Sequence, residues 1–261
     1  MTADTPLLQL QDIRMRFGAI EALRGVSFDI RRGEVVALLG DNGAGKSTLV
    51  KIISGGLQAT SGTMVFDGSE RHFANPSEAK AAGIETVYQD LSLCTNVDVV
   101  ANFFMGREIV KRYFGIPILQ EAAMYEATER AISNAGTRIP SLRVNVEHLS
   151  GGQRQAIELN RFVHWGGKLV LLDEPFAALG VEQTRRGLEM IKNIAAQGIA
   201  VVVITHIMAQ AFQVADRIVV VRQGAVVGDV QSADTSPDAI VQLITGEALP
   251  GQARNARVSN P

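Results

Sequence analysis

Hydrophobic and polar positions alternate from Leu7 to Ile30, with Gly18 and Gly25 as interruptions. A period of two is typical of strands with one buried face, so this stretch predicts an antiparallel β flank. Residues 35–39 instead form a continuous apolar run that leads into a glycine-rich loop and a predicted helix near residues 47–53. Such a run is typical of a strand buried on both faces of a parallel sheet.

Two later apolar runs, residues 169–172 and 201–204, repeat the order of strand and then helix. This order is typical of parallel strands joined by crossover helices. Residues 98–157 have no strong strand signal and are rich in helix formers. We therefore expect an α/β fold with a parallel sheet, an antiparallel β flank and an inserted helical subdomain at about residues 90–160.

The C-terminal part predicts a hairpin and one more helix. Residues 217–221 and 225–230 flank Gln223–Gly224, which favours a tight turn, and Ser236–Pro237 has the form of a helix start. Beyond residue 246 the chain has no periodicity and is rich in Gly, Pro, Asn and Arg. With no internal repeat, residues 5–246 are expected to form one domain, followed by a flexible tail at 247–261.

Composition narrows the class of protein. The 261 residues are 46% hydrophobic and 20% charged with a formal net charge of −2, which gives no basic field for nucleic acid. A single cysteine, Cys94, excludes an intramolecular disulfide framework. The N-terminus lacks a signal-peptide pattern, and no apolar run approaches the ~20 residues of a membrane helix. We expect a cytoplasmic protein that reaches any membrane through a partner.

A phosphate-binding loop follows the first buried strand. Its backbone N–H groups can surround phosphate oxygens, while Lys46 reaches the β- and γ-phosphates and the Ser47 hydroxyl binds Mg²⁺. The alternative is a glycine-rich turn with a solvated lysine. The predicted ATP-binding residues are Gly40, Asp41, Asn42, Gly43, Ala44, Gly45, Lys46, Ser47 and Thr48.

Two adjacent carboxylates end the apolar run at 169–172. Beside a phosphate loop, Asp173 can position Mg²⁺ through water and Glu174 can polarise the attacking water. Without that loop, the same pattern would be a polar loop after a core strand.

A third motif, at residues 149–155, has a serine followed by two glycines at the start of a predicted helix. Read alone it is an N-cap and a helix start. Together with the phosphate loop and the carboxylates, it resembles the signature sequence of the ATP-binding-cassette (ABC) family. The resemblance extends from about Leu7 to Gly246 and implies a P-loop NTPase core.

The resemblance implies further roles. Phe17 would stack on adenine, although core packing is the alternative for this ring, and Gln89 would contact Mg²⁺ and the attacking water. His206 would contact the γ-phosphate. Two subunits would pair head to tail, so that the signature of one covers ATP held by the other; the signature residues are Ser150, Gly151, Gly152 and Gln153.

Within the family, several stretches resemble the ATP-binding subunits of bacterial monosaccharide importers of the fructose, ribose or xylose type. That likeness implies an ATPase at the cytoplasmic face of the inner membrane, bound to permease subunits and served by a periplasmic solute-binding protein. Two residues depart from the common family pattern: Phe176 stands where Thr or Ser is usual, and Gly180 stands where Asp is usual. The alternatives are an ABC ATPase acting on a macromolecular machine and a regulatory module without turnover.

The partner surface is expected at residues 91–107. This stretch has more apolar residues than one helix needs to face its own core, so some of them, such as Phe104, are expected to be exposed to the permease. The alternative is that all of them pack internally.

Overall fold

The computed structural model describes residues 5–87, 93–134, 139–176 and 180–246. Its central six-stranded sheet has the order β12-β11-β3-β10-β9-β6, in which only β12 runs antiparallel to its neighbour. The predicted strands and hairpin are confirmed. The strands are β3 (Val35–Leu39), β6 (Ile84–Val87), β9 (Leu169–Asp173), β10 (Ala200–Ile204), β11 (Arg217–Arg222) and β12 (Ala225–Gln231).

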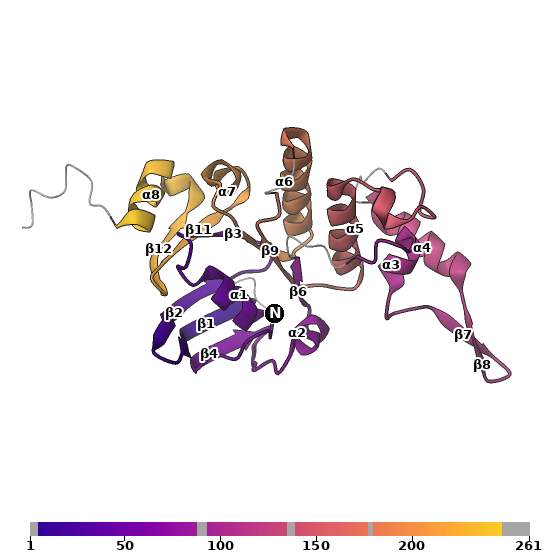
Figure 1. The fold of residues 1–261 in the computed structure, drawn as a ribbon, viewed down its shortest axis with the longest axis horizontal. Helices are drawn as coiled ribbons and strands as arrows, with labels where there is room; N and C mark the ends of the chain where they lie inside the picture. Colours follow the sequence, from indigo (N-terminus) through magenta and orange to yellow (C-terminus); the bar gives the residue numbers. More distant parts are fainter. Residues whose placement is uncertain (1–4, 88–92, 135–138, 177–179, 247–261) are drawn as a thin grey trace, which may run out of the picture.

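A second, antiparallel sheet of order β2-β1-β4-β5 lies beside the central sheet (Figure 1). It confirms the predicted β flank and adds two strands that the alternation did not reveal. Its strands are β1 (Leu8–Phe17), β2 (Ile20–Ile30), β4 (Ser61–Phe66) and β5 (Ser69–Glu70).

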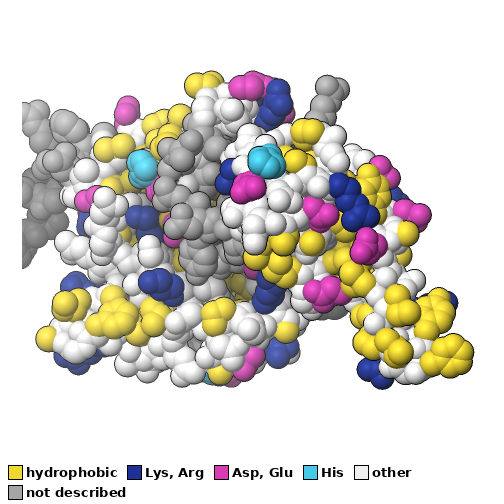
Figure 2. All heavy atoms as spheres, turned by 45° about the vertical axis from the view of Figure 1, so that its right-hand side comes forward, with side chains coloured by type: hydrophobic (Ala, Val, Ile, Leu, Met, Phe, Trp, Pro, Cys, Tyr) yellow, Lys and Arg dark blue, Asp and Glu magenta, His cyan; other side chains and the backbone are white. Residues whose placement is uncertain are grey.

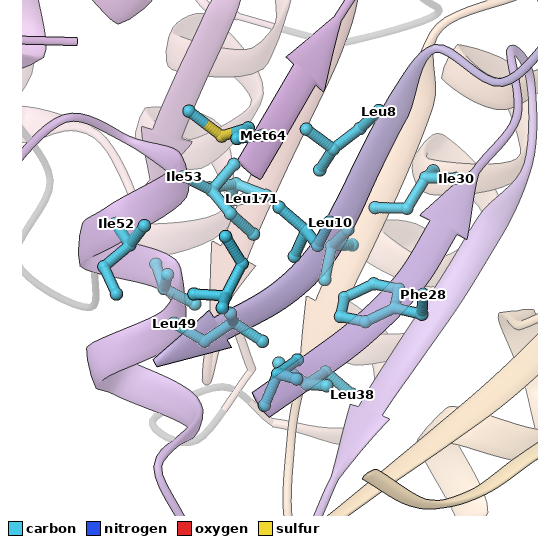
Figure 3. Packing of buried hydrophobic residues seen from close by; sticks show 14 of the residues in the cluster. Leu8, Leu10, Phe28, Ile30, Leu38, Leu49, Ile52, Ile53, Met64 and Leu171 are labelled. Carbon is cyan, nitrogen blue, oxygen red and sulfur yellow. The ribbon is translucent and has the colours of Figure 1, made fainter. Parts of the chain in front are cut away.

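Strand β3 is buried on both faces, as its continuous apolar run predicts. Val36 and Leu38 belong to the core shared with the antiparallel sheet and α1 (Lys46–Ile53). Figure 3 shows Leu38 in this cluster together with Leu49 of α1. Val35, Ala37 and Leu39 belong to the opposite core. That core is covered by α6 (Val181–Ala196), α7 (Met208–Val214) and α8 (Pro237–Thr245).

The helical subdomain has a hydrophobic core of its own, which includes Phe103, Met124 and Ile157. It forms one end of the molecule in Figure 1. Its described elements are α3 (Val99–Phe104), the hairpin strands β7 (Val110–Tyr113) and β8 (Ile116–Leu119), α4 (Glu121–Asn134), the 3-10 helix η1 (Val146–His148) and α5 (Gly151–His164). The hairpin was not predicted.

The interpretation of Phe104 as an exposed residue of the partner surface is wrong. This side chain is 1% exposed, and most of its apolar neighbours in residues 93–104 are also buried. The reason is that the six-residue α3 packs against both α4 and α5, so more than one of its faces is internal. Met105, just after the helix, is 45% exposed. Leu91 lies outside the described residues.

Three smaller elements complete the fold. The first is α2 (Pro76–Ala82), which precedes β6, and the second is the 3-10 helix η2 (Ser232–Asp234). Ser236 caps α8 by accepting a hydrogen bond from the Ala239 N–H, and Pro237 is its first residue, as predicted. The tail at 247–261 lies outside the described residues. Among the residues described, no helix is both long enough and apolar enough to span a bilayer.

Candidate functional site

The phosphate loop joins the end of β3 to the start of α1. Gly45 is the N-cap of α1 in a left-handed conformation and makes no side-chain cap, so the first N–H groups of the helix remain available to an anion. Glycine is required at two positions of this loop. A Cβ at Gly40 would lie 2.1 Å from the Val221 carbonyl oxygen, and one at Gly45 would lie 2.8 Å from the Ala22 carbonyl oxygen.

Lys46 lies across this loop. Its Nζ donates hydrogen bonds to the carbonyl oxygens of Gly40 (2.8 Å) and Asp41 (2.9 Å). Burial lowers the pKa of Lys46, and the negative charges of Glu174 and Asp173 oppose that effect. The Lys46 ammonium therefore lies where it could bind a phosphate held by the loop. Both predicted carboxylates are close enough to interact with its charge.

Asp173 and Glu174 lie at the carboxyl edge of the central sheet. Asp173 is the last residue of β9 and pairs with Ile204, the last residue of β10. The Glu174 N–H donates to the Ile204 carbonyl oxygen (2.9 Å), and Glu174 has a φ of +48°. A non-glycine residue in this region is strained, and such strain concentrates at functional sites.

Glu174 and His206 are brought into direct contact. The distance from Glu174 Oε1 to His206 Nδ1 is 2.8 Å, although the two residues are 32 positions apart. They meet because β9 and β10 are neighbouring parallel strands, whose carboxyl ends share one edge. The geometry can orient a carboxylate toward a water molecule and place a histidine beside it.

Sequence reasoning missed the residue that shapes the turn at His206. Thr205 is buried, and its Oγ1 accepts a hydrogen bond from the Ile207 N–H (3.0 Å), which fixes the backbone on both sides of the histidine. A threonine at the end of an apolar strand is a recognised signal for this kind of local turn.

The donors available to Mg²⁺ are hard oxygens. Burial raises the pKa of Asp173, Glu174 raises it further, and Lys46 opposes both, so the edge carries negative charge that a cation would offset. Asp173 and the exposed hydroxyl of Ser47 fit Mg²⁺, which binds a few protein oxygens together with phosphate and water. The described residues include no group of three or more His, Cys, Asp or Glu side chains placed to hold a metal. Gln89 lies outside them.

The predicted helix start at Ser150 is confirmed. Its Oγ accepts from the Gln153 N–H (3.3 Å), and the Ser150 N–H donates to Gln153 Oε1 (3.0 Å), which together form a capping box. Ser150 and Gly151 are exposed, and Gly152 is half-buried. This open helix start belongs to α5, well separated from α1 in Figure 1. One copy of the chain therefore does not bring the two motifs together.

Phe17 does not pack in the core. The ring is 46% exposed at the end of β1, next to the turn that leads into β2. The core alternative for this residue is excluded, while stacking on adenine stays a prediction.

Phe176 is buried against α6. A Cβ on Gly187 would lie 2.3 Å from the Phe176 ring, so the glycine provides the space for it. An isolated glycine within a helical pattern is the sequence signal for such a close approach. The unusual aromatic thus anchors the segment after Glu174 to α6.

The family model described as ABC transporter matches residues 23–177. The chain is 43% identical to the xylose/arabinose import ATP-binding protein XylG of Sulfolobus acidocaldarius, over 93% of this chain and 95% of that protein. It is 39% identical to the fructose import ATP-binding protein FrcA of Rhizobium meliloti, over 95% and 97%. The ribose import ATP-binding protein RbsA 2 of Escherichia coli O157:H7 is 34% identical over 94% of this chain but only 47% of its own length.

Solved structures agree on the fold. A crystal structure of an ATP-binding cassette of an ABC transporter in its ADP conformation superposes with a TM-score of 0.78, at 24% identity over 93% of this chain and 100% of that one. The family model covers more than half of the chain, and two relatives above 30% identity are matched along nearly their whole length. The chain belongs to the ABC transporter family, as one of its ATP-binding domains.

Proposed function

We propose that this chain binds and hydrolyses ATP to power the import of a monosaccharide through a separate membrane permease. The observation that carries the enzymatic part is the 2.8 Å contact between Glu174 and His206 at the sheet edge that also holds Asp173. The sugar assignment is supported by the relatives named above, whose printed names are those of xylose/arabinose, fructose and ribose import proteins.

In the proposed reaction, each residue acts on a different part of the nucleotide. Lys46 exchanges its two carbonyl contacts for the β- and γ-phosphates, and the Glu174 carboxylate polarises the water that attacks the γ-phosphate. His206 holds that carboxylate on one side and faces the γ-phosphate on the other. Mg²⁺, held by Ser47 and Asp173, would supply charge neutralisation on the phosphates when bound.

We infer that the working unit is a head-to-tail pair of chains. Ser150 and Gly151 form an exposed helix start in a different subdomain from the phosphate loop, so they can reach a nucleotide only in a second copy. ATP would then be bound by both chains, which draws them together until hydrolysis removes the shared contact.

The permease is expected to dock in a cleft between α2, α3 and the end of α5. This cleft of about 450 Å³ is lined by four basic side chains and one acidic one, together with aromatic and small residues. Arg107 stacks over the Trp165 ring at 5.0 Å, and Trp165 donates to the Phe103 carbonyl oxygen (3.3 Å). An acidic, apolar segment of a membrane protein fits this chemistry.

The proposed subunit works at the cytoplasmic face of the membrane, with a solute-binding protein delivering the sugar on the other side.

Reversing the charge of a side chain in the cleft tests the proposed docking site. Arg107→Glu should keep basal ATPase activity and lose co-purification with the permease, whereas Lys192→Glu, on an exposed part of α6 outside the cleft, should keep both. Equal retention of the permease by the two variants would contradict the docking site.

Subunit mixing tests the pairing and the hydrolytic role together. Lys46→Ala and Ser150→Ala chains should each be inactive alone at the same total concentration. When the two are mixed, a pair that contains one chain of each has one complete site. The Ser150→Ala chain supplies its phosphate loop, and the Lys46→Ala chain supplies its helix start. Phosphate release that rises on mixing supports the pairing, and a mixture as inactive as its components would contradict it if one complete site can turn over alone.

A further inference from the structure

The β7–β8 hairpin is an exposed apolar element with no core of its own. Of the twelve large hydrophobic side chains exposed in the described residues, seven lie between positions 109 and 119. Figure 1 shows the hairpin projecting from the helical subdomain, and Figure 2 shows a hydrophobic cluster at that end of the molecule. The seven are Ile109, Val110, Tyr113, Phe114, Ile116, Ile118 and Leu119.

Both faces of this two-stranded ribbon are apolar. Cross-strand partners share a face in an antiparallel pair, so the register assigns three apolar residues and one cation to each face. One face carries Val110, Leu119, Pro117 and Arg112, and the other carries Tyr113, Ile116, Ile118 and Lys111. A flat protein partner would cover only one of them, whereas a fluid interface surrounds both.

The tip carries an exposed aromatic ring in a strained backbone. Phe114 is fully exposed, and it has a φ of +48° beside Gly115 at +83°, so both central residues of the turn have positive φ. Such turns favour Asn or Gly at the first position, and a phenylalanine there is costly both in conformation and in exposure. A residue that breaks local preferences in this way points to a function.

The charge of the hairpin selects an anionic partner. Residues 109–119 contain Lys111 and Arg112 and no carboxylate, while the whole chain has a formal net charge of −2. The Lys111 ammonium lies 5.2 Å from the Tyr113 ring centre. Aromatic and aliphatic side chains flanked by cations are the composition of segments that lie at the interface of an anionic bilayer.

We propose that the tip of the β7–β8 hairpin inserts into the headgroup region of an anionic membrane and helps to hold the ATPase against the bilayer. The hairpin begins at Val110, shortly after Met105 and Arg107 in the chain. These two residues line the cleft assigned to the permease, so the two contacts would lie close together. The proposal extends the proposed transport function, but its test requires no turnover. A negative result for membrane binding therefore does not contradict the transport function, and a negative result for transport does not contradict membrane binding.

Vesicle flotation of the full chain without nucleotide tests this inference. We expect the protein to float with vesicles of equal parts phosphatidylglycerol and phosphatidylcholine and to bind far less to phosphatidylcholine alone. Replacing Lys111 and Arg112 together by Ala should weaken binding by about fivefold per residue. Phe114→Ser should weaken it by about tenfold or more, because the ring loses its apolar contact.

The matched control is Val241→Ser, which removes an exposed apolar side chain of α8 far from the hairpin in Figure 1. This variant should bind vesicles as the wild type does, and thermal unfolding should show all variants folded. Equal flotation of Phe114→Ser and Val241→Ser would overturn the proposal. Absence of vesicle binding by the wild type would also overturn it. In that case, loss of the permease by the hairpin variants would assign the hairpin to the permease, and loss of a concentration-dependent association would assign it to a second copy of this chain.

Discussion

Phe104 gives a stringent test of which residues near the proposed permease cleft are core and which are surface. Its side chain is 1% exposed, and its ring centre lies 5.4 Å from that of Trp165 in a T-shaped contact. Truncating a buried phenylalanine costs about 3–5 kcal/mol. This cost is a large part of the about 5–15 kcal/mol of stability that a domain has in total. Each kcal/mol shifts the unfolding temperature of a domain of this size by about 2–4 °C, so Phe104→Ala should lower that temperature by roughly 6–20 °C.

The only tryptophan of the chain makes the assay local. Trp165 touches Phe104, so its fluorescence reports the helical subdomain directly while far-UV circular dichroism follows the whole chain. The control is Met105→Ala, one residue further on and 45% exposed, which should cost less than about 1 kcal/mol. The assignment of Phe104 to the core fails if its truncation costs no more than that of Met105.

Two further predictions concern the nucleotide site. Gly45→Ala should abolish binding of a fluorescent ATP analogue, because the residue has a φ of +107° and its Cβ would lie 2.8 Å from the Ala22 carbonyl oxygen; retained affinity would contradict the loop geometry. Asp173→Asn should unfold at the same or a higher temperature than wild type at pH 7 without nucleotide, yet gain less from added Mg²⁺ and ATP. Burial raises the pKa of Asp173 above its ordinary value of 3.8, so its stabilising contribution is present below that pH and lost as the pH rises through the raised pKa. A clearly destabilised Asp173→Asn would contradict this sign.

The parts of the fold and site set by local pattern could be predicted from the sequence. Alternation predicted the antiparallel flank, continuous apolar runs predicted β3, β9 and β10, and the serine at position 150 predicted the N-cap of α5. Each of these depends on neighbours within a few residues, for which period and capping rules are reliable.

Features that depend on distant parts of the chain could not be predicted in the same way. The contact between Glu174 and His206 depends on β9 lying beside β10, and the burial of Phe104 depends on α4 and α5 enclosing a short helix. The β7–β8 hairpin was not predicted because its turn is Phe114–Gly115 rather than a common Asn-Gly pair. Gln89 and the tail at 247–261 remain predictions.

The central claim is that this chain hydrolyses ATP with Glu174 as the residue that polarises water. The most direct measurement is the rate of phosphate release from purified wild-type and Glu174→Gln protein with saturating Mg²⁺ and ATP. Gln keeps the size of the side chain and a contact to His206 but loses the charge, so release should slow by about a hundredfold or more while ATP still binds. Equal rates for the two proteins would contradict the account.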